Sequence, residues 1–409
     1  MNIILICQYF FPETGGPSNR ILSLAKFFRD SGHRVTVIAE KPNHPAGVFF
    51  PGYERRFILR RRYEGIPVVY SWVYTRPKKA FLGRILFYTT FMATSVIASL
   101  WVRGKTDVVI ASSPPLFVGP SGWLVAKLKR AKYVFDVRDL WPKVAVAMGE
   151  LNGAKAIRIA EAIERFTYRK ADAVTTVTKS FSGEIEKVTQ KSKPVELVMN
   201  GAMTRLIDTV DRDAAFRELY AREYFTVTYA GNLGLAQGLG HIIDAAAILE
   251  KSDPGVRFRI IGSGPKQHEL VSRAREYGLS NVEFYDRVEL SRALQFLVAS
   301  DALVVPLVKD DIYRMFIPSK LFDSMAVGKP VLLSVDGEAR EILESAEAGL
   351  FYEPESSEGL VRAVRELRSS PEKAKAMGRN GYNVARARLS RDAQSKRFLA
   401  LLEKIVASK

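Results

Sequence analysis

The fold is decided by the stretch Thr226-Val-Thr-Tyr-Ala-Gly-Asn-Leu-Gly-Leu-Ala-Gln-Gly-Leu239, in which a strand-like run ends in closely spaced glycines. Runs of this kind are typical of buried strands in parallel sheets. An apolar pattern with helical spacing follows over Gly240–Leu249. A strand, a glycine-rich turn and a helix in this order predict a parallel sheet with helices on its faces.

The same alternation of strand and helix continues on both sides of this stretch. In the second half we predict strands at Arg257–Ile261, Val282–Tyr285, Ala302–Pro306 and Pro330–Ser334, and helices at Gln267–Tyr277 and Ser319–Ala326. In the first half we predict strands at Ile3–Cys7, Arg34–Ala39, Asp107–Ala111, Tyr133–Asp136 and Ala173–Thr176, and helices at Ser18–Phe28 and Val118–Leu128. The pattern predicts an α/β chain with two doubly wound parallel sheets.

The chain of 409 residues is too long for one hydrophobic core, which stops growing at roughly 250–300 residues. The best boundary is Asn200-Gly201, followed by a charged stretch. We therefore predict domains at 1–202 and 203–389, and a last helix at 390–409 that packs back toward the first domain. Because ligands of open parallel sheets bind beyond the carboxyl ends of the strands, we expect a cleft between two facing sheets.

The charge of the chain is uneven. It has 61 Lys and Arg against 44 Asp and Glu, a net charge of +17. Residues 1–200 hold 31 basic and 15 acidic residues, whereas residues 201–409 hold 30 and 29. Such asymmetry indicates that the first half faces an anionic surface, either lipid or nucleic acid. The single cysteine, Cys7, excludes a disulfide scaffold and a cysteine-based zinc site, and the four histidines are too scattered to form a motif such as H-E-x-x-H.

The segment 85–102, between Arg84 and Arg103, carries no charge over 18 residues and so reaches the lower limit of a membrane span. It contains five hydroxyl residues, and a strand pattern follows directly. These features favour a buried or interfacial helix over a span. The N-terminus has no basic region and no small-residue cleavage site, so it does not read as a secretory signal.

A basic and aromatic stretch precedes this segment. Each basic residue near an anionic leaflet contributes about 1 kcal/mol, and aromatic rings favour the membrane interface. We predict a membrane-associating region near 53–103 and a cytoplasmic protein bound to the inner face of the plasma membrane. A nucleic-acid surface and a solvated basic face are the alternatives. The residues assigned to the membrane or acceptor are Arg55, Arg60, Arg61, Arg62, Trp72, Lys78 and Lys79.

Two loops of the second half point to a nucleoside diphosphate. Gly231 and Asn232 end a strand before a helix, where glycine permits close approach of a phosphate and the helix N-terminus favours its charge. Ser319 and Lys320 open a helix after Pro318, and Lys320 adds a point charge. Asp323 falls one turn later and can accept ribose hydroxyls; the alternative is a surface ion pair with Lys320.

Two weaker features belong to the same half. The turn Ile261-Gly-Ser-Gly-Pro265 again places glycines between a strand and a helix, and a plain turn is an equal alternative. The segment Phe284-Tyr-Asp-Arg-Val288 ends a strand whose backbone can read the edge of a base.

Together these motifs resemble a known family. The resemblance includes Gln8-Tyr-Phe-Phe-Pro-Glu-Thr-Gly-Gly16, His44-Pro-Ala-Gly47 and Asp136-Val-Arg-Asp-Leu-Trp-Pro142 in the first half. The chain is similar over essentially its whole length to retaining glycosyltransferases of the GT-B fold, glycosyltransferase family 4. The most similar branch builds bacterial O-antigen and capsule and includes the N-acetylfucosamine transferases.

The resemblance implies a role for each matching residue. Gly15 and Gly16 would approach the donor diphosphate, and Ser319 with Lys320 would bind it from the other domain. Asp323 would bind the ribose, and Gly262 and Arg287 would lie near the nucleobase. Arg138, Asp139 and Lys320 are implied as the catalytic residues. The resemblance also implies retention at the anomeric carbon, no metal, no cofactor beyond the nucleotide-sugar co-substrate, and a polyprenyl-diphosphate-linked acceptor; no partner nucleic acid is expected.

The chain departs from the family pattern at three places. Met315 and Asp323 stand where the family has two glutamates, Asn232 and Gln237 lie in a loop that often carries Arg and Lys, and Arg138 replaces a sugar-binding histidine. These departures leave the donor open: a UDP-sugar is favoured, and a GDP-mannose-type donor is the alternative. A nucleotide-sugar epimerase and a non-enzymatic membrane or nucleic-acid binding protein are rivals from other classes.

Overall fold

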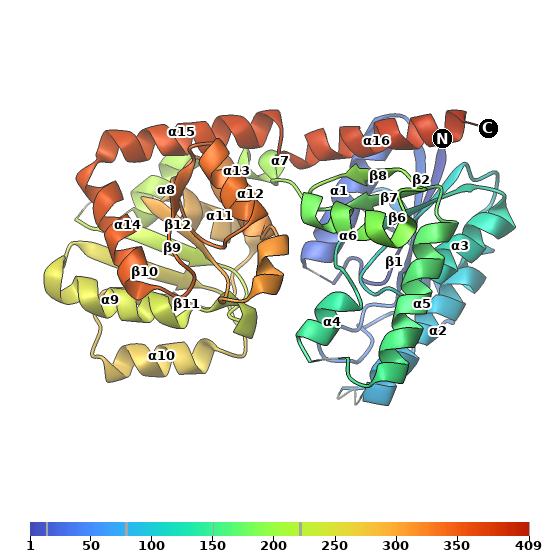
Figure 1. The fold of residues 1–409 in the computed structure, drawn as a ribbon, viewed down its shortest axis with the longest axis horizontal. Coiled ribbons are helices and arrows are strands. Elements are labelled where there is room, and N and C mark those ends of the chain that lie inside the picture. The colour runs from blue at the N-terminus through green and yellow to red at the C-terminus, as the bar shows by residue number, and fades with distance from the viewer. Residues whose placement is uncertain (14, 78–80, 150, 221–222, 409) are drawn as a thin grey trace. The chain divides into compact units, whose positions relative to one another are not determined.

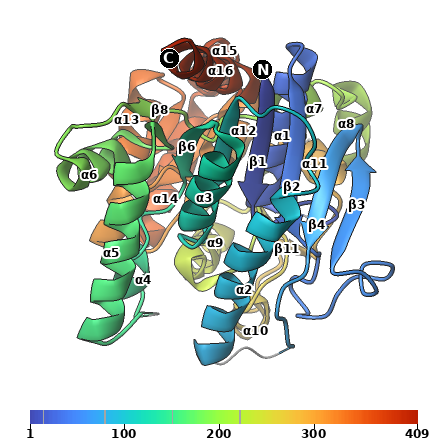
Figure 2. The same ribbon diagram turned by 90° about the vertical axis from the view of Figure 1, so that its right-hand side faces the viewer.

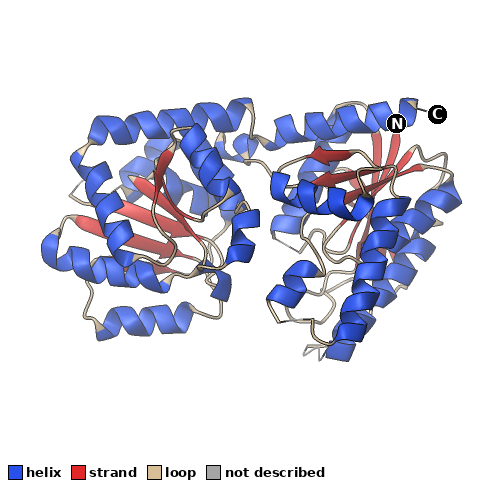
Figure 3. Cartoon of the chain, viewed as in Figure 1, coloured by secondary structure: helices blue, strands red, loops and turns tan. Residues whose placement is uncertain are grey.

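The computed structural model describes all residues except 14, 78–80, 150, 221–222 and 409 (Figure 1). It contains two compact units, the first made of Met1–Asn200 and Gln394–Lys409 and the second of Gly201–Ala393. Each unit is a sheet of mostly parallel strands with helices on both faces, which confirms the predicted α/β architecture (Figure 3). The first segment of unit one ends at Asn200, whereas the predicted domain boundary was 202. Its second segment begins at Gln394, whereas the predicted last helix began at 390.

The first unit is built on an eight-stranded sheet with the order β3-β4-β2-β1-β5-β6-β7-β8. The pairing of β3 with β4 is antiparallel, and the other pairings are parallel. Its strands are β1 (Asn2–Cys7), β2 (Arg34–Glu40), β3 (Ile58–Tyr63), β4 (Ile66–Ser71), β5 (Val108–Ser112), β6 (Lys132–Val137), β7 (Ala173–Thr176) and β8 (Val195–Leu197).

Helices cover both faces of this sheet. On one face α1 and the last helix, α16, share a core with β1, and the rings of Phe28 and Phe398 meet at 5.9 Å. On the other face α2, α3 and α5 lie side by side (Figure 2). The helices of this unit are α1 (Gly16–Asp30), α2 (Phe81–Ser99), α3 (Val118–Lys129), α4 (Lys143–Ala147), α5 (Ala154–Lys170), α6 (Lys179–Thr189) and α16 (Arg391–Ala407), whose first residues belong to the second unit.

The second unit is built on a six-stranded parallel sheet with the order β11-β10-β9-β12-β13-β14. Its strands are β9 (Phe225–Ala230), β10 (Val256–Ile261), β11 (Val282–Tyr285), β12 (Ala302–Pro306), β13 (Val331–Ser334) and β14 (Gly349–Phe351). Its helices are α7 (Thr204–Ile207), α8 (Arg212–Leu219), η1 (Leu235–Gln237), α9 (Gly240–Ser252), α10 (Gln267–Glu276), α11 (Leu290–Val298), η2 (Asp311–Met315), α12 (Ser319–Val327), α13 (Glu338–Ser345), α14 (Ser357–Ser369) and α15 (Pro371–Ala387).

The uncharged segment 85–102 forms most of α2. Phe87, Phe91 and Ala98 are buried on one side of this helix, which packs against β2, β4 and α3. In the described part of the chain, no helix combines the length and the hydropathy that a membrane span requires. The segment is therefore a helix of the first unit with one buried side, as its hydroxyl content predicted.

Candidate functional site

Lys320 lies in the first turn of α12, beside the end of β9. Its Nζ atom donates hydrogen bonds to the hydroxyl of Tyr229 at 2.5 Å and to Oε1 of Gln237 at 3.0 Å. The same atom lies 4.2 Å from the centre of the Tyr229 ring. Because Tyr229 belongs to β9 and Gln237 to η1, the lysine connects three elements of the second unit. The sequence singled out Lys320 but gave no sign of these two partners.

Burial lowers the pKa of Lys320 to about 7. An amine in a poorly solvated site loses the hydration that stabilises its charged form, so its pKa falls. At neutral pH the charged and neutral forms are then similarly populated, and an anion next to Nζ would favour the charged form. The site therefore offers a cation that is stabilised by an anionic ligand.

The Lys320 side chain passes close to the Cα atom of Gly231. A Cβ atom at Gly231 would lie 2.3 Å from Cε of Lys320, and the residue has φ +149. Real Cβ contacts are never so short, and this backbone conformation is one that glycine adopts most readily. A side chain at position 231 would therefore displace the end of the Lys320 side chain from its present place.

The turn at Gly262 packs directly on the turn at Gly231. The N–H of Gly231 donates to the carbonyl of Ile261 at 2.8 Å, and a Cβ atom on Gly262 would lie 1.8 Å from the Gly231 carbonyl oxygen. Gly262 is thus needed for the contact between two loops. Its predicted place near the nucleobase stays a prediction.

The carboxylate of Asp323 is occupied by the backbone of its own unit. Its Oδ1 accepts a hydrogen bond from the N–H of Met203 at 2.8 Å. Burial raises the pKa of Asp323, while the Arg391 guanidinium and this hydrogen bond oppose the rise. Among the described residues no ion pair joins Asp323 to Lys320, so the surface-pair alternative is wrong; ribose binding by Asp323 stays a prediction.

The remaining predicted residues of the second unit lie on its surface. Ser319 is exposed at the start of α12, and Asn232 is exposed in the loop after β9. Arg287 is exposed in the loop after β11. The structure thus brings Ser319, Lys320, Gly231 and Asn232 to the ends of neighbouring strands, where the helix N-terminus adds its own preference for an anion.

In the first unit, Arg138 and Asp139 follow β6 at the carboxyl edge of the sheet. The Arg138 Nε donates to the carbonyl of Ser113 at 2.5 Å, which joins the loops after β5 and β6. Burial raises the pKa of Asp139 to about 6, while the neighbouring Arg138 charge lowers it. A carboxyl with this pKa can carry a proton close to neutral pH.

A buried ion pair lies directly beneath these two residues. Asp136, at the end of β6, pairs with Arg20 of α1 at 3.0 Å and accepts hydrogen bonds from Ser112 at 2.7 Å and Thr175 at 2.8 Å. Burial opposes ionisation of Asp136, but the charges of Arg20 and Arg138 and the hydrogen bonds from Arg20 and Ser112 together hold the pKa of the carboxyl below its usual value. The sequence reasoning missed this pair, which joins α1 to three strands.

The two glycines at the start of α1, Gly15 and Gly16, are uncrowded. A Cβ atom on Gly16 would meet nothing within 4 Å, and one on Gly15 would meet only Pro17 at 3.8 Å. Just upstream, Oε1 of Glu13 accepts hydrogen bonds from the N–H groups of Asn43 and His44. The loops after β1 and β2 are therefore tied together, and the space beside Gly15 and Gly16 is open to a ligand.

Two family models match the chain in succession. Residues 15–201 match the glycosyl transferase 4-like domain, and residues 211–384 match the glycosyl transferases group 1 domain. The chain is a GT-B glycosyltransferase. Its two units correspond to these two domains.

Relatives and solved structures agree with this assignment. The glycosyltransferase is 27% identical over 382 residues to a protein of Escherichia coli (strain K12) named as a colanic acid biosynthesis glycosyl transferase, WcaI, with 90% of this chain and 92% of that protein covered. Its fold is similar to sucrose-phosphate synthase from Thermosynechococcus elongatus, with TM-score 0.75, 18% identity and full coverage of both chains. It is also similar to Anabaena HepE in complex with UDP, with TM-score 0.73, 19% identity, and 99% and 100% coverage.

The residues predicted to face a membrane lie around the β3 edge of the glycosyltransferase. Arg55 is exposed in the loop before β3, and Trp72 stacks on Phe57 with ring centres 6.1 Å apart. Lys78 and Lys79 lie outside the described residues. The guanidinium groups of β3 donate to backbone carbonyls at 2.7, 2.7 and 3.2 Å: Arg60 to Trp101, Arg61 to Gly52 and Arg62 to Gly65.

Metal ligands do not gather in the described part of the glycosyltransferase. No group of three or more His, Cys, Asp and Glu side chains there is placed to hold an ion. Asp310 accepts a hydrogen bond from the N–H of Ile312 at 2.9 Å and so caps η2.

Proposed function

We propose that this glycosyltransferase moves a sugar from a nucleoside-diphosphate sugar, a UDP-sugar in preference to a GDP-sugar, to a lipid-linked saccharide during assembly of a bacterial surface polysaccharide. The observation that carries the proposal is Lys320, held by Tyr229 and Gln237 beside the Gly231 turn. The similarity to WcaI supports the polysaccharide context, and the UDP complex of HepE supports the choice of nucleotide. Two glycosyltransferase models favour transfer over epimerisation.

The chemistry follows from the charge that develops as the sugar leaves. When the bond between the anomeric carbon and the diphosphate breaks, negative charge accumulates on the departing phosphate. Lys320 and the N-terminus of α12 would stabilise that charge, and preorganised groups of this kind supply the largest single part of many rate enhancements. We propose retention at the anomeric carbon, with the departing phosphate taking the acceptor proton, and no requirement for a metal or other cofactor.

Arg138 and Asp139 would act from the first unit. Arg138 is fixed by its hydrogen bond to the Ser113 carbonyl, and Asp139 can hold a proton near neutral pH. We assign the pair to the acceptor and the transferred sugar. The first unit would also bring the protein to the cytoplasmic surface of the plasma membrane, where a lipid-linked acceptor is found.

Binding of the nucleotide tests the donor site. UDP and GDP are added separately to the protein and the melting temperature is measured; we expect UDP to give the larger increase. Lys320→Ala should remove the increase, whereas Lys251→Ala, an exposed lysine on α9, should keep it. If neither nucleotide raises the melting temperature of the wild-type protein, the donor-site proposal fails.

Product formation tests the reaction itself. A panel of UDP- and GDP-sugars is incubated with polyprenyl-diphosphate-linked saccharides, with and without EDTA, and lipid-linked product is scored. We expect one UDP-sugar to be used and EDTA to have no effect. The anomeric configuration of the product, determined by NMR, should equal that of the donor; inversion would contradict the proposed stereochemistry.

A further inference from the structure

The outward side of α2 is apolar along its length. Leu86, Ile97 and Leu100 are 41%, 41% and 65% exposed, and with Ala93 they recur at spacings of seven, four and three residues. Residues at these spacings share one side of a helix. Helix α2 ends at Ser99, so Leu100 and then Trp101, which is 41% exposed, follow it directly. The side of α2 that turns away from the sheet thus exposes large apolar groups.

The neighbouring helices extend this surface. Helix α3 packs between α2 and α5 on the same face of the sheet (Figure 2). Of the 15 large hydrophobic residues that are exposed in the described chain, five lie on this layer of helices and two more directly follow α2. We call them the apolar face: Leu86, Ile97, Leu100, Trp101, Leu124, Leu128 and Ile159.

Cations accompany the apolar face. The Nζ atoms of Lys127 and Lys170 lie 5.4 and 5.9 Å from the Trp123 ring, which meets the Phe166 ring edge-on at 5.0 Å. Neither α2 nor α3 contains an acidic residue, and α5 contains two, Glu161, which pairs with Arg165 at 3.6 Å, and Glu164, against five basic residues. An aromatic ring beside lysines is typical of side chains at a membrane interface.

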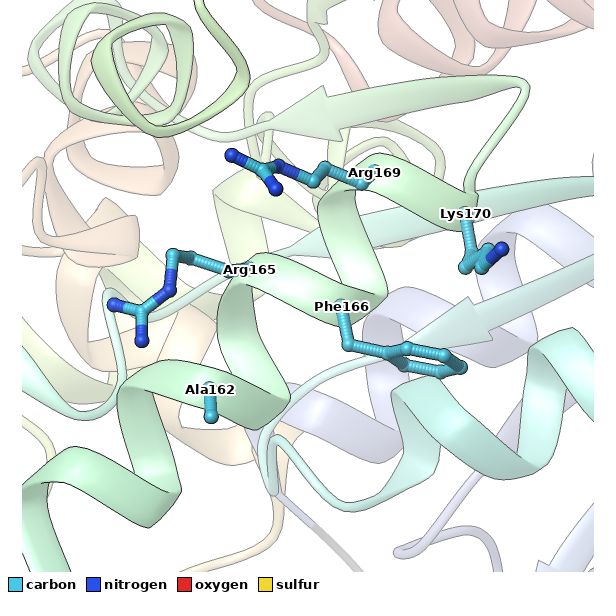
Figure 4. A pocket seen from close by; sticks show the side chains of 5 residues that line it. All are labelled: Ala162, Arg165, Phe166, Arg169 and Lys170. Atoms are coloured by element: carbon cyan, nitrogen blue, oxygen red, sulfur yellow. The ribbon is translucent and has the colours of Figure 1, made fainter.

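A hollow of about 440 Å³ lies along α5 on the same layer. It is lined by Ala162, Arg165, Phe166, Arg169 and Lys170. Figure 4 shows that Arg165 and Arg169 project to one side of the helix and Phe166 and Lys170 to the other. The lining of the hollow therefore combines three cationic side chains with the Phe166 ring, a combination that suits a phosphate-bearing headgroup.

The positive charge beside the apolar face indicates which kind of partner binds there. Exposed apolar surface of this extent marks an interaction site. A second copy of the chain meeting the same face about a two-fold axis would oppose cations to cations, since such an interface pairs a patch with itself. An anionic bilayer accepts both the apolar groups and the cations.

We propose that the apolar face with Lys127, Arg169 and Lys170 docks the protein on an anionic lipid bilayer, with Trp101 and Trp123 at the level of the headgroups. The inference rests on the proposed function, for which it locates the membrane contact. It does not depend on the guanidinium groups of Arg60, Arg61 and Arg62, which donate to the backbone carbonyls of Trp101, Gly52 and Gly65.

Co-sedimentation with vesicles tests this placement. The vesicles are phosphatidylcholine mixed with phosphatidylglycerol, with phosphatidylcholine alone for comparison. We expect the wild-type protein to bind the mixed vesicles. Lys127→Gln with Lys170→Gln should weaken binding by about fivefold for each neutralised charge. Leu100→Ser with Leu128→Ser should weaken it by about tenfold or more, because both side chains would lose their insertion into the acyl region.

Matched controls separate this surface from the rest of the molecule. Ile248→Ser with Lys251→Gln, a similar pair on α9 of the second unit, should leave vesicle binding unchanged, and Arg60→Gln/Arg61→Gln/Arg62→Gln should weaken it less than the Lys127 and Lys170 pair. Nucleotide-induced stabilisation should survive in every variant, which shows that the variants are folded and that the donor site is independent.

Three results would overturn the inference while leaving the donor site intact. In the first, a protein that UDP stabilises does not bind the mixed vesicles. In the second, the Leu100→Ser/Leu128→Ser variant binds these vesicles as well as the wild-type protein does. In the third, the wild-type protein is a dimer in sedimentation equilibrium and this variant is not. The last result would assign the face to contact between copies of the chain.

Discussion

A Cβ atom on Gly231 would lie 2.3 Å from Cε of Lys320. The side chain that we assign to the donor phosphate therefore passes over a residue that has no room for even a methyl group. Gly231→Ala should displace Lys320 from Tyr229 and Gln237 and remove the stabilisation by UDP, measured as the increase in melting temperature.

The matched control for this prediction is Gly278→Ala. Gly278 also has a positive φ, +68, but a Cβ atom there would meet nothing within 4 Å. It should cost roughly 1 kcal/mol of stability through backbone strain and leave the UDP effect intact. Full nucleotide binding by Gly231→Ala would show that the position of Lys320 is not required.

Donor affinity should depend on pH through Lys320. Since its pKa is about 7 without ligand, the lysine is mostly charged below pH 7 and mostly neutral above it. A bound diphosphate favours the charged form and so raises this pKa. UDP affinity, measured by calorimetry, should therefore fall as pH rises through 7 toward the higher pKa of the complex. Lys320→Gln should bind weakly at every pH; an unchanged pH profile in this variant would assign the titration to another group.

The same pKa has a consequence for stability. The folded pKa of Lys320 lies below the ordinary lysine value of 10.5, so between pH 7 and 10.5 the unfolded chain binds more protons than the folded one. The free energy of unfolding then receives a contribution that rises with pH over this window. Lys320→Gln should lack this contribution in a comparison of the two pH profiles.

Asp323 can be tested for ribose binding separately from its structural role. Asp323→Asn keeps an oxygen that can accept from the N–H of Met203. If the carboxylate also binds ribose, the variant should lose about 1.5–3 kcal/mol of UDP affinity, the usual contribution of a hydrogen bond to a charged group. Inorganic pyrophosphate has no ribose, so its affinity should not change. An equal loss for both ligands would contradict a ribose contact.

The alternation of strands and helices can be predicted from the sequence because buried parallel strands are continuous apolar runs. The hairpin of β3 and β4 cannot, since β3 carries Arg60, Arg61 and Arg62 and has no apolar pattern. In the structure β3 is an edge strand, where charged side chains prevent pairing with another chain. A run of arginines that indicated a lipid surface thus also has a structural explanation.

The sequence predicts only some of the residues of the candidate site. A glycine turn and a lysine at a helix start are local patterns, so Gly231 and Lys320 were found. Tyr229 and Gln237 contact the lysine across more than 80 residues of chain, and nothing in their own neighbourhoods marks them. Asp323 was found by spacing, but its partner Met203 depends on how the chain enters the second unit.

The ion pair of Arg20 and Asp136 should behave as a buried unit. The pair is almost inaccessible to solvent, with side chains 5% and 0% exposed. Removing one partner leaves a buried charge without compensation, so Arg20→Met or Asp136→Leu should each destabilise the first unit by about 3–5 kcal/mol. The double variant should cost much less than the two single variants together.

All four tryptophans, Trp72, Trp101, Trp123 and Trp141, lie in the first unit, so tryptophan fluorescence during urea unfolding follows this unit alone. Additive losses would show that Arg20 and Asp136 stabilise the fold through separate contacts, with Asp136 acting mainly through Ser112 and Thr175.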